Sequence, residues 1–83
     1  MEHYLILARS VTYAQRMKRQ LENGGIRSQI LRPPRDLTDS GCAYALRIAV
    51  NDLAASLKIL RGAGYSPIQV YVYQFGVYQE VGE

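Results

Sequence analysis

The chain has 83 residues, of which 48% are hydrophobic and 20% charged, a composition that indicates a globular rather than a disordered chain, and its length allows one domain and not two. Ten basic and seven acidic residues give a net charge of +3, too small to indicate a nucleic-acid-binding protein. The single cysteine excludes an internal disulfide, and the opening MEHYLILARS fits neither a signal peptide nor a membrane span. We therefore expect one cytoplasmic domain over residues 1–83, with neither a membrane nor a nucleic acid as its partner.

The first half of the chain predicts a strand, a helix and a second strand. HYLILAR, residues 3–9, is almost continuously apolar, as expected for a central strand. Ser10 is a good N-cap for the helix that follows, in which apolar residues recur at helical spacing: Val11, Ala14, Met17 and Leu21. NGG at 23–25 favours a helix end at glycine, and IRSQILR at 26–32 alternates until Pro33 and Pro34 end it as an edge strand.

The second half repeats this order after a long loop, residues 33–41. CAYALRIAV at 42–50 predicts another central strand, and Asn51 or Asp52 can cap a helix with Leu53, Leu57 and Leu60 on its apolar side. GAG at 62–64 ends that helix, and PIQVYVYQF at 67–75 alternates like a last strand. Residues 76–83 either extend this strand past a bulge at Gly76 or cross to a partner chain.

The order βαββαβ predicts an α+β fold, a ferredoxin-like sandwich with a four-stranded antiparallel sheet and both helices on one face. We expect the strands to lie in the order fourth, first, third, second. This order brings three segments together at one end of the strands. They are the end of the first strand at Arg9, the start of the first helix at Ser10 and Thr12, and the start of the third strand at Gly41 and Cys42.

The position of Cys42 at this end of the strands can be interpreted in two ways. Cys42 shares its side-chain parity with Tyr44 and Leu46, so it points toward the helices in a regular strand, and free cysteine is often buried. The other interpretation is a nucleophilic thiolate, stabilised by the helix N-terminus together with Arg9 and Arg35. The loop is longer than most hairpin connections, and long ordered loops often carry function.

No other group of residues predicts a catalytic or metal site. The only histidine, His3, lies at the opposite end of its strand, and no pair of carboxylates has a spacing that suggests acid–base catalysis. One cysteine and one distant histidine do not make a metal site, so we expect neither metal nor cofactor.

Aromatic residues on the last predicted strand suggest a homodimer surface. Tyr71, Tyr73 and Phe75 share one parity, which faces away from the helices beside Ala45, Arg47 and Ala49 of the third strand. Aromatics next to small residues on an open sheet face are typical of a dimer interface. RNA-binding domains of this fold instead carry aromatics in a motif on the central strands, which is absent here.

The chain also resembles a small bacterial family of selenium/sulfur carrier-like proteins. The resemblance spans about residues 4–72 and rests on LENGGI at 21–26, PPRDL at 33–37 and SGCAYALRI at 40–48. It implies that Cys42 bears sulfur or selenium and that Arg35 is the family's loop arginine. Ala43 stands where members often carry glycine, and the Cys-Pro motif of the better-known small sulfur carriers is absent, so their mechanism is not carried over.

Two functions follow as hypotheses. In the first, the protein is a carrier rather than a complete enzyme and holds sulfur or selenium on Cys42 as a persulfide or selenyl-sulfide. A donor enzyme loads it and an acceptor protein unloads it, while Ser40 and Gly41 control access to the thiol. In the second, the protein is a noncovalent ligand-binding or regulatory module in which arginines and helix amides hold a small anion and Cys42 is only a packing residue.

Overall fold

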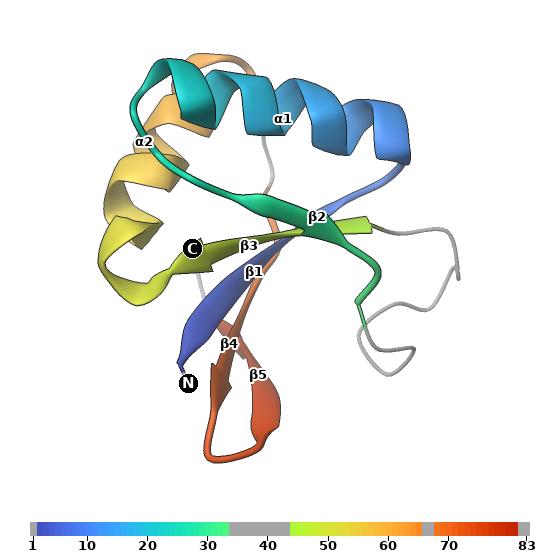
Figure 1. Cartoon of the computed structure of the whole chain (residues 1–83), viewed down its shortest axis with the longest axis vertical. Coiled ribbons are helices and arrows are strands. Elements are labelled where there is room, and N and C mark those ends of the chain that lie inside the picture. The colour runs from blue at the N-terminus through green and yellow to red at the C-terminus, as the bar shows by residue number, and fades with distance from the viewer. Residues whose placement is uncertain (1, 34–43, 66–67, 82–83) are drawn as a thin grey trace.

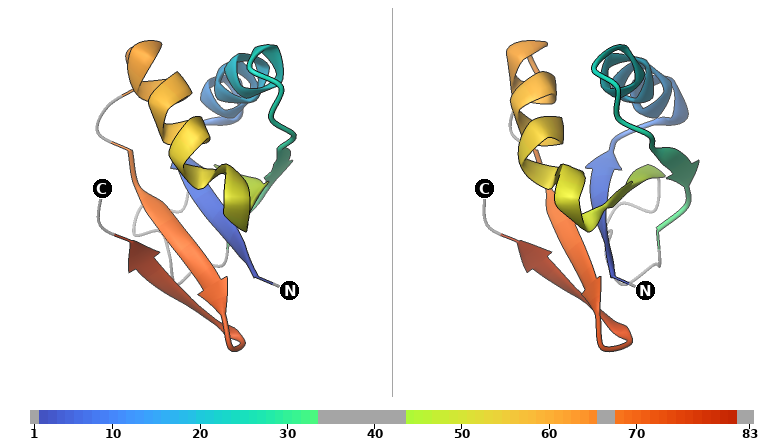
Figure 2. Two further views of the ribbon diagram at one scale, coloured as in Figure 1. Left: turned by 90° about the vertical axis from the view of Figure 1, so that its left-hand side faces the viewer. Right: turned by 60° about the vertical axis from the view of Figure 1, so that its left-hand side comes forward.

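The computed structural model describes residues 2–33, 44–65 and 68–81, in which two helices cover one face of a five-stranded antiparallel sheet (Figures 1 and 2). The elements in chain order are β1 (His3–Ala8), α1 (Val11–Asn23), β2 (Gln29–Leu31), β3 (Tyr44–Ala49), the short 3₁₀ turn η2 (Val50–Asp52), α2 (Leu53–Gly62), β4 (Val70–Gln74) and β5 (Val77–Val81). None of the helices in these ranges is long and apolar enough to cross a membrane.

The sheet confirms the predicted order of four strands and adds a fifth. The observed order is β2-β3-β1-β4-β5, so the first four strands lie as the βαββαβ pattern predicts. The prediction of a four-stranded ferredoxin-like sheet is wrong at one edge, because β5 pairs with the outer side of β4. The chain is therefore an α+β protein of order βαββαββ.

A tight turn at Phe75 and Gly76 creates the fifth strand. Their φ angles are 54° and 78°, and Gln74 pairs with Val77 on either side of them. Two successive positive φ angles are the signature of a two-residue hairpin turn, which sends the chain back along the strand it has just left. The segment therefore neither extends β4 past a bulge nor crosses to a partner chain, and Phe75 lies in the turn instead of the strand.

Glycine ends both helices in the same way, as the two similar halves of the sequence predict. After α1, Gly25 has a φ of 81° and Ile26 N–H donates to the Leu21 carbonyl at 2.8 Å. After α2, Gly64 has a φ of 92° and Tyr65 N–H donates to the Leu60 carbonyl at 2.9 Å. Only glycine adopts this backbone conformation without a steric penalty, so these residues stop each helix and turn the chain back toward the sheet.

The two helix starts differ. Ser10 is extended and its Oγ accepts a hydrogen bond from Tyr13 N–H at 3.1 Å, which confirms the predicted cap of α1. Asp52 stands at the N-cap position of α2, but its side chain makes no capping hydrogen bond. The chain enters α2 through η2 instead, so the backbone is already helical when α2 begins.

The main core lies between the helices and the sheet. It takes every second residue of the central strands, which is the alternation expected of a sheet covered on one side. Its fully buried large side chains on this side are Ile6, Leu21, Leu46, Ile48, Leu60 and Val70.

The sheet face opposite the helices is also buried in part. Leu5 and Ala45 have no exposed surface there, whereas Arg47 and Ala49 are exposed. The expectation of an open face around Ala45 is therefore wrong at its centre. The nearly continuous apolar run in β1 agrees with this finding, because strands buried on both faces lose their alternation.

Replacing Ser56 in α2 with alanine is expected to stabilise the fold. Ser56 is completely buried, and its Oγ has no hydrogen-bond partner among the described residues. Removing an unpaired buried hydroxyl and improving helix propensity should raise the free energy of unfolding by about 1 kcal/mol in urea denaturation. The reverse change at an exposed position of the same helix, Ala55→Ser, should lower it by no more than about 0.5 kcal/mol. A loss of stability in Ser56→Ala would contradict the prediction.

Candidate functional site

Three segments of the chain meet at one end of the strands. Ala8 pairs with Tyr44, and Leu31 pairs with Ala45, so β1 and β2 end where β3 begins. The N-terminus of α1 follows directly on β1 and lies at the same end of the strands (Figure 1). We call the described residues at this end of the strands the rim: Arg9, Ser10, Thr12, Arg32 and Tyr44.

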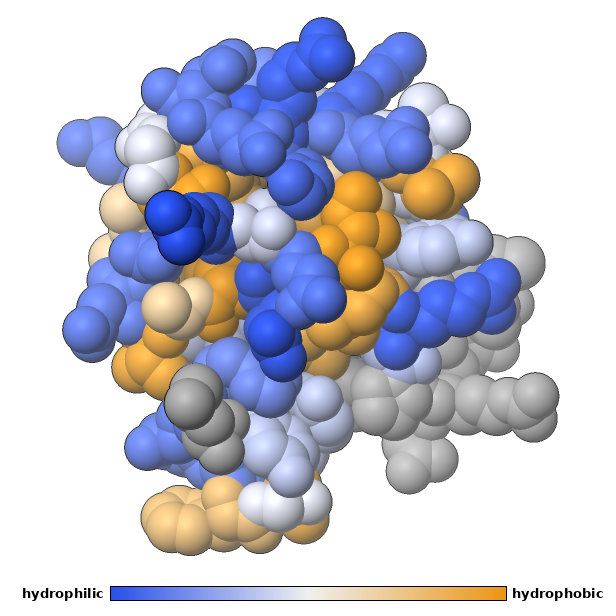
Figure 3. Space-filling view, viewed as in Figure 1, coloured by the Kyte–Doolittle hydropathy of each residue, from blue (hydrophilic) through white to orange (hydrophobic). Residues whose placement is uncertain are grey.

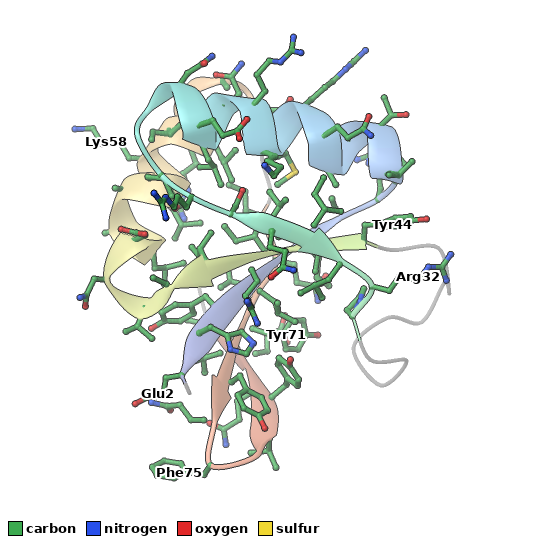
Figure 4. All side chains as sticks on the ribbon, in the orientation of Figure 1. Glu2, Arg32, Tyr44, Lys58, Tyr71 and Phe75 are labelled. Carbon is green, nitrogen blue, oxygen red and sulfur yellow. The ribbon has the colours of Figure 1, made fainter. Side chains whose placement is uncertain are left out.

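Two arginines of the rim lie over tyrosine rings. The Arg9 guanidinium carbon is 4.9 Å from the centre of the Tyr13 ring, and that of Arg32 is 5.2 Å from the centre of the Tyr44 ring. Figure 4 shows Arg32 and Tyr44 side by side, where the described chain leaves β2 and where it enters β3. Such cation–π contacts hold a guanidinium at a defined place while leaving its N–H groups able to bind an anion.

The start of α1 adds positive potential to the rim. The first amides of a helix have no carbonyl partner within the helix and carry a partial positive charge. Ser10 Oγ accepts from one of them, the amide of Tyr13. The first turn of α1 contains no acidic side chain that would offset this charge, and Thr12 is exposed. The rim is therefore suited to a small anion or a thiolate.

The two tyrosines under these arginines pack against the core. Tyr13 packs against the main core and meets the Tyr65 ring edge to face, with the ring centres 5.2 Å apart. Tyr44 packs against the same core from β3. The positions of both arginines are thus coupled to half-buried aromatic rings on two different elements.

The structure describes part of the site predicted from the sequence. Arg9, Ser10 and Thr12 lie together at the start of α1, as expected. Arg35, Ser40, Gly41 and Cys42 lie outside the described residues. Sequence reasoning missed Arg32, for which its place between the edge strand and Pro33 was an available signal, and it assigned Tyr44 to the core without noting its place at the rim.

The predicted aromatic face is divided by the hairpin turn. Tyr73 stacks on His3 with ring centres 5.0 Å apart and lies 4.8 Å from the ring centre of Tyr78 on β5. Tyr71 receives a hydrogen bond from the Gln69 side chain at 3.3 Å. Phe75 is 96% exposed at the tip of the hairpin, where Figure 4 shows it projecting from the molecule. Figure 3 shows hydrophobic side chains at this end of the molecule. Phe75 does not share a strand face with the two tyrosines.

His3 lies far from the rim. It opens β1, whereas Ala8 closes it, and five steps of about 3.3 Å separate the two by about 17 Å. The His3 ring lies instead beside Tyr78, with Nε2 3.4 Å from the phenol oxygen. In the described part of the chain, no three side chains among His, Cys, Asp and Glu are close enough to hold a metal ion.

Together, the sheet order and the basic rim define a small α+β domain with its candidate binding site at the start of the first helix. The chain belongs to the family described as "Putative Se/S carrier protein-like", which it matches over residues 3–72. This confirms the resemblance seen in the sequence. Neither the curated proteins nor the solved structures include a significant match to the chain.

Proposed function

We propose that the protein carries a sulfur or selenium atom on the side chain of Cys42 and passes it from a donor enzyme to an acceptor protein. The observation that carries this proposal is the family membership over residues 3–72, which include Cys42. The positive rim is its physical support, since a carrier must keep its thiol nucleophilic between loading and unloading.

The neighbourhood of Tyr44 connects Cys42 to the rim. Tyr44 follows Cys42 by two positions in the sequence and pairs with Ala8, just before the N-cap Ser10. Two residues of extended chain span at most about 7 Å, and we propose that this short connection brings the thiol of Cys42 to the start of α1. In the proposed site, the first amides of α1 stabilise the thiolate.

The arginines supply the remaining charge in this proposal. Arg9 and Arg35 are the residues proposed from the sequence, and Arg32 joins them because it lies over the ring of Tyr44. A delocalised guanidinium neutralises a sulfur anion without donating its own proton, because it stays charged at all physiological pH values. Ser40 and Gly41 would control access to the thiol from the segment that precedes it.

The transfer chemistry balances without an added oxidant or reductant. The Cys42 thiolate attacks the terminal sulfur of a donor persulfide, R–S–SH. A new S–S bond forms to Cys42, the old S–S bond breaks, and the donor leaves as the thiolate R–S⁻. An acceptor thiolate then attacks the terminal sulfur on Cys42, takes it and restores the Cys42 thiolate. Selenium follows the same steps from R–S–SeH. The protein thus acts as a carrier and not as a complete catalyst.

The proposal predicts a modified Cys42 in protein taken from cells. Intact-mass analysis under non-reducing conditions should show a species heavier by one sulfur or one selenium atom, and peptide mapping should place that atom on Cys42. Dithiothreitol should remove it. Cys42→Ser should lack the heavier species, whereas Arg61→Ala, an exposed arginine at the far end of α2, should retain it.

A second measurement tests the reactivity of the thiol. Cys42 should react with iodoacetamide at neutral pH about tenfold faster than free cysteine, or more, and unfolding in urea should remove the difference. Slow labelling of the folded protein together with an unmodified mass would count against the carrier. That result would favour the noncovalent module, for which Cys42→Ala should leave anion binding unchanged.

A further inference from the structure

The outer edge of β5 is the feature of the structure that the carrier proposal does not use. β5 is the last strand of the sheet, and it begins after the family match ends at residue 72. Figure 2 shows it beyond β4, away from the two helices. A strand in this position presents unpaired backbone groups along one side, which can pair with another strand.

The pairing of β4 shows which groups of β5 point outward. Leu7 N–H donates to the Gln69 carbonyl at 3.0 Å, so the odd-numbered residues of β4 direct their backbone groups toward β1. Val70, Val72 and Gln74 therefore direct theirs toward β5. Gln79, the partner of Val72, points inward, whereas Tyr78 and Glu80 direct their N–H and carbonyl groups away from the sheet.

Among the residues that the structure describes, this edge has little of the usual protection against strand pairing. Natural sheets protect an edge with charged residues, above all lysine, with proline, with a bulge or with a very short strand. β2, at the opposite edge, has only three residues and is followed by Arg32 and Pro33. β5 has five residues, VYQEV, which are rich in strand-forming types and include Glu80 as the single charge.

We propose that β5 pairs antiparallel with β5 of a second copy of this chain, with the two-fold axis at Gln79. In this register Tyr78 lies opposite the partner's Glu80, and Val77 lies opposite the partner's Val81. The outward backbone groups of Tyr78 and Glu80 then make two hydrogen-bonded pairs with their counterparts, and Gln79 forms the non-hydrogen-bonded pair on the axis. The two sheets become one continuous sheet of twice the width.

The neighbouring symmetric registers are disfavoured. Centring the pair on Glu80 places two carboxylates directly opposite each other, which destabilises a strand pair. Centring it on Tyr78 brings Glu80 opposite Gly76 of the turn and loses the contact between the valines. The Gln79 register avoids both problems. It places Val77 opposite Val81 and Tyr78 opposite Glu80, so that apolar side chains meet and the carboxylates stay apart. The interface is independent of Cys42 and leaves the rim free.

Sedimentation velocity over a concentration series tests the dimer. The wild-type chain should shift from monomer to dimer as the concentration rises. Gln79→Lys places two ammonium groups together on the axis and should raise the dissociation constant by roughly tenfold or more. Gln29→Lys is the matched control, because Gln29 is likewise an exposed glutamine on an edge strand, and it should leave the constant unchanged.

Cysteine crosslinking tests the register. The Cα atoms of a non-hydrogen-bonded pair lie about 4.5 Å apart, within the range of a disulfide. In a Cys42→Ser background, Gln79→Cys should therefore oxidise to a covalent dimer, and Glu80→Cys and Gln29→Cys should not. A chain that stays monomeric at every concentration overturns the proposal. So does a dimer that Gln79→Lys leaves intact, which would point to the face of Tyr71 and Tyr73 instead.

Discussion

Replacing Leu46 with alanine is expected to lower the free energy of unfolding by about 3 kcal/mol. Leu46 is fully buried at the centre of β3, where it pairs with Ile6 of β1 and Ile30 of β2 on the side covered by the helices. The truncation removes buried methyl groups and leaves a cavity that three strands cannot close. A domain of this length has a total stability of about 4–12 kcal/mol, so the loss is a large part of it.

Urea denaturation followed by circular dichroism measures this change. Leu57→Ala is the matched control, because it removes the same atoms from a half-buried position of α2. It should cost clearly less than Leu46→Ala, about 1–1.5 kcal/mol, because fewer of the removed atoms are shielded from water. Equal losses in the two variants would show that the core is not centred on β3.

Local sequence signals were sufficient to predict the first four strands, both helices and their glycine-terminated ends. The reason is that each signal has one physical meaning at short range. A 3.6-residue apolar spacing needs a helix to bury one side, and glycine at Gly25 and Gly64 permits a backbone that other residues avoid. Neighbouring strands then followed from the βαβ connections, whose order leaves few arrangements.

The fifth strand could not be predicted in this way. The turn at Phe75 and Gly76 requires positive φ angles at both positions, and Asn-Gly or Asp-Gly is the usual sequence for it. Phenylalanine gives the opposite signal, because it continues the alternation of Tyr71 and Tyr73. The turn forms because β4 has an unpaired side that residues 77–81 can cover, and this is a tertiary effect.

For the described residues of the rim, the place in the fold was predictable from the sequence, but the contacts between side chains were not. The strand order alone brings Arg9 and Ser10 to the end of the sheet at which β3 begins. The stacking of Arg32 on Tyr44 depends on the distance between two side chains from different strands, which no spacing along the chain encodes.

The opposite face of the sheet should be as sensitive to truncation as the main core, and Leu5→Ala is expected to cost about 3 kcal/mol. Leu5 has no exposed surface, although it faces away from both helices. Its neighbours across the strands are Arg47 on β3 and Tyr71 on β4, whose long side chains can cover a leucine between them. In a central strand that is buried on both faces, the side chains of both faces add buried apolar surface to the fold.

The matched control for Leu5→Ala is Leu7→Ala, on the same strand and the same face but only half-buried. Urea denaturation should show a loss of about 3 kcal/mol for Leu5→Ala and about half of that for Leu7→Ala. A cost below about 1 kcal/mol for Leu5→Ala would mean that this face is open in solution. The sheet would then depend on the helices alone, and the broad alanine and tyrosine surface expected from the sequence would be restored as a candidate interface.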